Sequence, residues 1–107
     1  MLGKIVRVTV DRPLGSHHPS HSDIVYPINY GYIEEIIAPD GEEQDAYILG
    51  INKPIKEYTG KIIAIVHRLD DVEDKWVVAS EDTQYTKEEI IQQVEFQEKF
   101  FEYEIIM

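Results

Sequence analysis

Five short apolar runs, separated by turn-forming residues, constrain the fold of this chain more than any other feature. They are rich in β-branched residues and lie at residues 4–10, 30–37, 46–51, 61–66 and 75–79. Runs of this length and composition are typical of β-strands. The fourth run is almost wholly aliphatic, which predicts a central strand buried on both faces. Five short strands joined by turns predict a small, closed or partly closed β-barrel of the OB-like kind.

One helix is predicted after the last strand. Thr86 and Glu89 form a capping box, which marks the start of a helix that we expect to run to about Tyr103. This helix carries an apolar stripe that can close the barrel, formed by Ile90, Val94 and Phe101. Since the chain has 107 residues, we expect one domain over residues 1–107, mainly β with a single C-terminal helix.

Charge and composition exclude several classes of partner. The formal net charge is −11, which disfavours binding to a nucleic-acid backbone and would repel a phosphorylated substrate unless divalent cations intervene. The chain has no cysteine, which excludes disulfides and thiolate metal sites. No apolar run approaches the length of a membrane span. We therefore expect a cytoplasmic protein that binds neither nucleic acid nor membrane, and a homo-oligomer remains open.

Two acidic loops stand out against this background. An aromatic segment, residues 26–32, leads into a turn that carries Asp40, Glu42 and Asp45, and a second acidic cluster occupies residues 70–75. Mg²⁺ prefers oxygen ligands and takes one or two carboxylates alongside waters and substrate phosphates. Two carboxylate loops held by short strands therefore favour a magnesium site for phosphate chemistry. The alternative for each loop is a solvated charged turn.

The two motifs together resemble those of the family I soluble inorganic pyrophosphatases. That family carries Tyr-Pro-x-Asn-Tyr-Gly-Tyr followed by Asp-Gly-Asp-Pro-x-Asp, and the spacing between the two segments is the same here. The resemblance runs from about Val8 to Ser80. It departs from the pattern at Glu42, which replaces the middle aspartate, and at Glu43-Gln44. It implies a pyrophosphatase-type barrel and Mg²⁺-dependent hydrolysis of inorganic diphosphate to two phosphates by a metal-bound hydroxide.

The resemblance also implies roles for individual residues. The metal ligands would be Asp11, Asp40, Asp45, Asp70 and Asp74. The catalytic groups would be Glu42, Tyr30 and Asp45, and the phosphate contacts would include Lys75 and Tyr103. Asp71 and Glu73 are interpreted as flanking residues. Because Glu42 is one methylene longer than the aspartate it replaces, its oxygens would lie about 1 to 1.5 Å further out, and a misplacement of that size can cost roughly a hundredfold in rate.

Several basic phosphate contacts of the family have no counterpart here. Arg12 is the preferred substitute, because its forked donors match phosphate oxygens. The loop that carries His17, His18 and His21 could bind phosphate, or a softer metal such as Mn²⁺ or Zn²⁺. The alternative is a polar exposed loop. His67 and Arg68 are a further option, although a pair of ordinary strand-end charges explains them equally well.

Two other functions stay open at this point. The first is hydrolysis of another phosphoanhydride or phosphoester, such as a nucleotide, with the histidine loop recognising the leaving group. The second is a binding module that keeps the fold and a metal site but has lost turnover. The retained candidate metal ligands favour the enzyme, because an idle site has no physical need for so much converging negative charge.

Overall fold

The computed structural model describes residues 1–71 and 73–107. In chain order its elements are β1 (Ile5–Arg12), β2 (Asn29–Ile37), β3 (Glu43–Ile48), β4 (Glu57–Arg68), β5 (Asp74–Ala79), α1 (Lys87–Glu98) and β6 (Tyr103–Ile106). Within these residues, no helix is long and apolar enough to cross a membrane.

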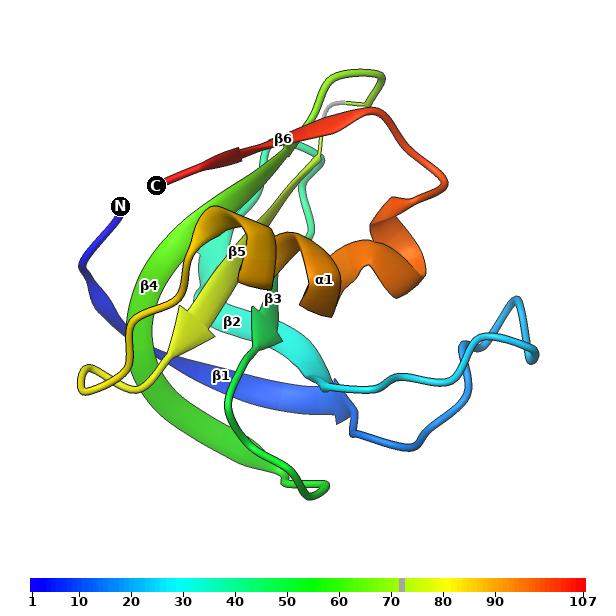
Figure 1. Ribbon diagram of the computed structural model, residues 1–107, viewed down its shortest axis with the longest axis horizontal. Coiled ribbons are helices and arrows are strands. Elements are labelled where there is room, and N and C mark those ends of the chain that lie inside the picture. Colours follow the sequence, from blue (N-terminus) through cyan, green and yellow to red (C-terminus); the bar gives the residue numbers. More distant parts are fainter. Residues whose placement is uncertain (72) are drawn as a thin grey trace.

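Five of the strands close into a barrel, which confirms the predicted fold. The strand order is β1-β2-β3-β5-β4, and β1 pairs with β4 to complete the closure (Figure 1). Neighbouring strands are antiparallel except for β3 and β5, which are parallel. The long strand β4 makes the closure possible, because its first half pairs with β1 and its second half with β5. The helix α1 lies across β3 and β5 (Figure 1).

The C-terminal end of the chain differs from the prediction. The helix ends at Glu98 and not near Tyr103, so Phe101 lies outside it. The chain then forms β6, a sixth strand antiparallel to the second half of β4. The free edge of β4 offers backbone partners to β6, and the pairing places Ile105 in the core. A tertiary contact has therefore overridden the local preference for helix.

The strand β4 also differs in detail from the prediction. It begins at Glu57 instead of Lys61, because the polar residues at its start pair with the backbone of β1. The expected burial on both faces is found only in part. Ile62 is buried, whereas Ile63 and Ile65 are half-buried. One face of this strand is therefore incompletely covered.

A close approach between β1 and β2 explains the glycine of the aromatic segment. A Cβ atom at Gly31 would lie 1.9 Å from the carbonyl oxygen of Thr9, which no side chain can tolerate. The register of the two strands shifts between Val10 and Arg12, so Asp11 is the extra residue of a bulge. Bulges re-aim side chains near functional sites. Here the bulge turns Asp11 and Arg12 toward different cavities, described below.

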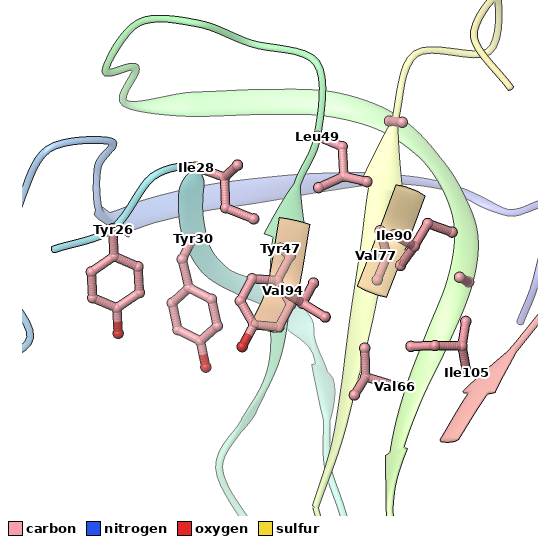
Figure 2. Close-up of a cluster of buried hydrophobic side chains, with 12 residues drawn as sticks. Tyr26, Ile28, Tyr30, Tyr47, Leu49, Val66, Val77, Ile90, Val94 and Ile105 are labelled. Atoms are coloured by element: carbon pink, nitrogen blue, oxygen red, sulfur yellow. The ribbon is translucent and has the colours of Figure 1, made fainter. Parts of the chain in front are cut away.

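Two apolar clusters form the core. One lies under α1 and contains Tyr26, Tyr30 and Tyr47 together with Ile90 and Val94 of the helix, as the helix prediction expected for the last two (Figure 2). Figure 2 shows the three tyrosine hydroxyls pointing to the same side. The other cluster is built from the alternate strand residues, among them Val8, Ile33, Ile48, Ile62, Trp76 and Val78. The tyrosines thus bring a row of polar groups to the edge of an apolar core.

Candidate active site

The hairpin between β2 and β3 carries the first acidic loop at its tip. Gly41 has φ +87°, a left-handed conformation that glycine adopts without strain. This turn lets the Asp40 carboxylate accept a hydrogen bond from the backbone N–H of Glu42 at 3.0 Å. That bond, and a contact with the Glu73 side chain, lower the pKa of Asp40. Asp40 is therefore held in its charged form close to a second carboxyl group.

An acidic cavity of about 380 Å³ lies beside this tip. Its lining residues are Asp11, Tyr32, Asp40, Glu42, Glu43, Asp45 and Glu73. They come from the bulge of β1, the β2–β3 hairpin and the turn before β5. Desolvation, together with the charge of Asp45, raises the pKa of Asp11. The fold thus gathers Asp11, Asp40, Glu42 and Asp45 of the predicted site around one cavity.

A second and larger cavity of about 640 Å³ adjoins the first, and Asp45 lines both. Its polar lining includes three cationic side chains, those of Arg12, Arg68 and Lys75, and also Tyr30. The guanidinium carbon of Arg12 lies 5.6 Å from the centre of the Tyr30 ring, and Lys75 Nζ lies 5.9 Å from it. The predicted phosphate contacts Arg12 and Lys75 therefore both lie close to the Tyr30 ring.

Lys75 connects the two cavities. The parallel register of β3 and β5 pairs Ala46 with Trp76, which makes the preceding residues neighbours as well. Lys75 Nζ lies 2.5 Å from Asp45 Oδ2 and 3.0 Å from Glu73 Oε2. The Lys75 side chain is buried, so these contacts lie in a medium that strengthens them. A cation is thus fixed at the boundary between the acidic and the basic cavity.

Tyr30 is placed to donate a hydrogen bond at the same boundary. Burial raises the pKa of its phenol well above the usual value, and the nearby Asp45 carboxylate raises it further. The phenol therefore stays protonated over the physiological range. A protonated phenol can donate to a carboxylate, a water or a phosphate oxygen.

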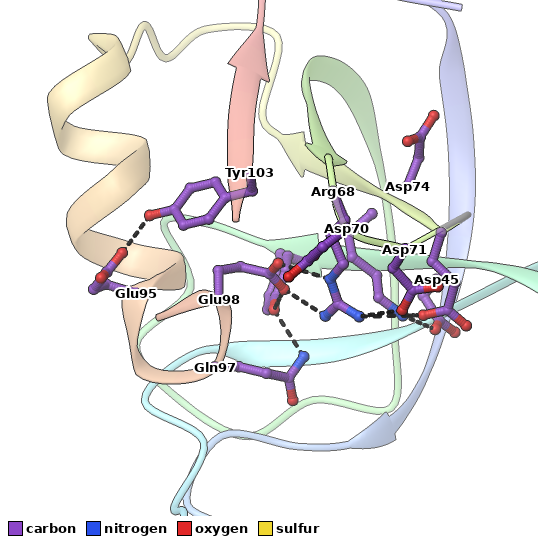
Figure 3. Close-up of polar contacts among 12 residues, drawn as sticks. Asp45, Arg68, Asp70, Asp71, Asp74, Glu95, Gln97, Glu98 and Tyr103 are labelled. Atoms are coloured by element: carbon purple, nitrogen blue, oxygen red, sulfur yellow. Dashed lines mark hydrogen bonds and ion pairs between the residues drawn. The ribbon is translucent and has the colours of Figure 1, made fainter. Parts of the chain in front are cut away.

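Two of the predicted metal ligands lie elsewhere. Asp74 Oδ1 contacts His67 Nδ1 at 2.7 Å, and Asp70 Oδ2 accepts a hydrogen bond from the backbone N–H of Glu102 at 3.2 Å. Neither aspartate lines the acidic or the basic cavity. Figure 3 shows Asp74 well separated from Asp45. The arrangement of the cavities thus gives no support to a metal role for these two residues.

Two other predicted substrate contacts also lie outside the cavities. The Tyr103 phenol donates to the Glu95 carboxylate, and burial and this partner raise the pKa of Tyr103 (Figure 3). His17 Nδ1 lies 2.7 Å from the Ser22 carbonyl oxygen. His18, in contrast, lines the larger cavity.

The sequence interpretation missed two residues of this site, Glu73 and Glu98, and named a third, Arg68, only as a further option for a phosphate contact. Glu73, treated as a flanking residue, lines the acidic cavity, and Arg68 lines the basic one. Glu98 is fully buried and binds Arg68 through both carboxylate oxygens, at 2.9 and 2.8 Å (Figure 3). Signals for two of them existed in the sequence. Glu73 lies two positions before Lys75, and Glu98 follows Val94 by four, at the spacing of the apolar stripe.

A continuous set of hydrogen bonds joins the two arginines through the core. Arg12 donates to the Tyr26 hydroxyl at 2.9 Å, and Tyr26 donates to Gln97 at 2.9 Å. Gln97 donates to Tyr47 at 2.8 Å, and Tyr47 donates to Glu98 at 2.6 Å. Glu98 in turn holds Arg68. The end of α1 thereby fixes both arginines of the larger cavity, although neither of them is on the helix.

The acidic cavity fits a divalent metal in donor chemistry. All its charged groups are carboxylates, which are the ligands that Mg²⁺ selects. Asp40 and Glu73 are close enough to interact directly, and a divalent cation can bind between two such carboxylates. Among the residues described, no three acidic or histidine side chains are already gathered in a complete metal-binding group. Waters and phosphate oxygens would have to complete the coordination.

The comparisons with known proteins concern the family and the fold. The family model "Inorganic pyrophosphatase" matches residues 4–105. No curated protein matches the sequence. An inorganic pyrophosphatase from Neisseria gonorrhoeae is 20% identical, with a TM-score of 0.67 over 88% of this chain and 72% of that one.

Two further solved structures are similar. An inorganic pyrophosphatase from Ehrlichia chaffeensis is 13% identical, with a TM-score of 0.71 over 97% of this chain and 85% of that one. One from Thermus thermophilus is 16% identical, with a TM-score of 0.62 over 96% and 80% of the two chains. These structures establish the fold. The family match supports inorganic diphosphatase activity.

Proposed function

The chain belongs to the inorganic pyrophosphatase family, and from this premise we propose that it is a Mg²⁺-dependent hydrolase that converts inorganic diphosphate to two phosphates. The observation that carries the proposal is the junction of an acidic and a basic cavity at Asp45. Diphosphate hydrolysis needs both: oxygen ligands for a divalent cation and cationic groups for phosphate oxygens. The two sets of side chains meet around Lys75, which contacts Asp45 and Glu73.

The acidic cavity would hold the metal. Asp40, Asp45 and Glu73 are its preferred ligands, and Asp11 lines the same cavity. When bound, Mg²⁺ supplies charge neutralisation of the phosphate oxygens and lowers the pKa of a coordinated water. Mn²⁺ takes the same oxygen ligands and is the expected alternative.

The other side chains of the site would act on the substrate and on the water. Arg12, Arg68 and Lys75 bind phosphate oxygens, and Arg12 can do so through paired donors. The Tyr30 phenol donates a hydrogen bond to a phosphate oxygen or to a water. Glu42 accepts a proton from the attacking water at the edge of the acidic cavity. The cytoplasmic location and the homo-oligomer stay predictions.

The proposal is tested by phosphate release from diphosphate with Mg²⁺, with Mn²⁺ and without metal. The parent should be active only with metal, and Asp45→Asn should lower kcat/KM about a hundredfold or more, since it removes a charged oxygen from the metal site. Glu35→Gln is the matched control, because Glu35 is exposed on β2 and lines neither cavity. It should keep the parent rate within about twofold.

Two results would count against the proposal. A folded Asp45→Asn variant with the parent rate would exclude this assignment of the metal site. A parent that binds Mg²⁺ but releases no phosphate from diphosphate with either metal would make the chain a binding module.

A further inference from the structure

The larger cavity offers more room than diphosphate needs. Its volume is about 640 Å³, which lies within the range of pockets that hold drug-sized organic molecules. At roughly 30 Å³ per water-sized group, the cavity accommodates about twenty such groups, whereas diphosphate has about nine non-hydrogen atoms. Diphosphate bound by the three cations would therefore leave a large part of the cavity for another group.

The other residues that line the cavity differ in chemistry from the three cations. Most of them come from the loop between β1 and β2 and from the segment after α1, and Figure 1 shows both on the side of the barrel where the helix ends. These segments contribute side chains that are mostly aromatic or apolar: His18, His21, Ile24, Phe100 and Phe101. A site for diphosphate alone has no use for such a surface, because phosphate oxygens need donors and cations.

The aromatic side chains offer flat surfaces to a ligand. Phe100 is 61% exposed, a large apolar exposure beside a cavity that it lines. His18 stacks on Tyr26 with 7° between the ring planes, and its ring centre lies 5.3 Å from that of His21. Burial, and then the positive charge of Arg12, lower the pKa of His18, so its ring is neutral near pH 7. A neutral ring adds stacking surface and no phosphate-binding charge.

One acidic side chain that lines the cavity also suits an organic group. Asp23 lines the cavity within the same loop as His18 and His21. A carboxylate would repel a phosphate, but it accepts hydrogen bonds from the hydroxyl or amino groups of a sugar or a heterocycle. The cavity therefore offers cations for phosphates together with aromatic surfaces and an acceptor for an organic group. Arg68 lies where the two sets meet, because its guanidinium carbon is 3.7 Å from the centre of the Phe101 ring.

We infer that this site accepts organic diphosphates, in which a flat aromatic ring lies against the segment around Phe100 and the histidine loop while the diphosphate contacts Arg12, Arg68 and Lys75. Nucleoside diphosphates have this chemistry. The inference rests on the proposed function for the chemical step: the water oxygen bonds to the terminal phosphorus, the bond from that phosphorus to the bridging oxygen breaks, and the products are phosphate and the organic monophosphate.

Equilibrium binding separates this inference from the proposed function. Titration calorimetry with Mg²⁺ compares ADP with methyl diphosphate, which has the same phosphates but no ring. Both compounds carry a methylene bridge between their phosphorus atoms in this experiment, so that neither is hydrolysed during the titration. Stacking of one base on an aromatic side chain is worth about 1 to 3 kcal/mol, so ADP should bind about tenfold more tightly than methyl diphosphate. The variant Phe100→Ala should lose about fivefold in ADP affinity and keep its affinity for methyl diphosphate. Met107→Ala, an exposed residue that does not line this cavity, is the control and should change neither affinity.

Equal affinity of the parent for ADP and methyl diphosphate would overturn the inference. An equal loss of affinity for the two compounds in Phe100→Ala would also overturn it. Phosphate release from inorganic diphosphate, and from ADP and methyl diphosphate with their natural oxygen bridge, distinguishes this inference from the proposed function. If diphosphate is hydrolysed and the ring has no effect on binding, the proposed function stands and this inference fails. If ring-dependent binding is found without any turnover, this inference stands and the proposed function fails.

Discussion

Replacing Glu98 with alanine would leave the Arg68 guanidinium buried without its main partner. Glu98 is fully buried and Arg68 is 4% exposed, so water cannot take over the lost interaction. Burial by itself lowers the pKa of Arg68, but the hydrogen bonds to Glu98 outweigh this effect and raise the pKa. Arg68 therefore stays charged. The Tyr47 hydroxyl would also lose its acceptor. Two buried polar groups are thus affected by one substitution.

The magnitude follows from these contacts. Removing one member of a buried ion pair costs about 3 to 5 kcal/mol, because an uncompensated charge remains. Arg68 keeps weaker contacts with Glu73 at 3.3 Å and Asp71 at 3.8 Å, which offset part of the cost. We therefore expect a loss of about 3 kcal/mol, a large fraction of the roughly 5 to 15 kcal/mol by which domains are stable.

Urea unfolding followed by the fluorescence of Trp76, the single tryptophan, measures this loss. The double variant Arg68→Met with Glu98→Leu removes both charges and should recover most of the stability, because an apolar pair of similar volume replaces the ion pair at little cost. Glu88→Ala, an exposed acid on the same helix, is the control. A loss below about 1 kcal/mol for Glu98→Ala, or a double variant no more stable than the single one, would refute the argument from an uncompensated buried charge.

Three further predictions concern metal, pH and backbone packing. Millimolar Mg²⁺ should raise the melting temperature of the parent, since a ligand that binds only the folded state stabilises that state. The Asp40→Asn variant should show a smaller rise in melting temperature. Equal rises for the two proteins would argue against the acidic cavity as the metal site. The Asp74 carboxylate raises the pKa of His67 above 6.5, so the pair stabilises the fold fully below pH 6.5 and this contribution is lost as the pH rises through the folded-state pKa. NMR titration should show that pKa return toward 6.5 in Asp74→Asn, and an unchanged value would contradict the assignment. Gly31→Ala should destabilise the fold by more than about 3 kcal/mol, because the alanine Cβ would lie 1.9 Å from the Thr9 carbonyl oxygen. A melting curve by circular dichroism close to that of the parent would contradict this prediction, because it would show that β1 and β2 can move apart at low cost.

The local pattern of the sequence was enough to predict the barrel and the start of the helix. The signals for strands and turns depend only on residues that are close in sequence. The Thr86–Glu89 capping box is likewise a contact within one turn of the helix. The acidic hairpin tip is local for the same reason: Asp40, Gly41 and Glu42 form one turn, which the structure contains. The local sequence of these segments is therefore enough to indicate their structure.

Only the tertiary structure decided how the pieces of the site meet. The parallel pairing of β3 with β5 brings Asp45 to Lys75, and no periodicity within either segment indicates that pairing. The end of the helix was wrong in the prediction because β6 pairs with the edge of β4, a partner distant in sequence. The buried pair of Arg68 with Glu98 depends on the same packing. The local sequence pattern specifies which residues share a face of a strand or helix, whereas the closure of the barrel specifies which faces come together. The charged side chains of this site therefore gain their partners only when the barrel closes.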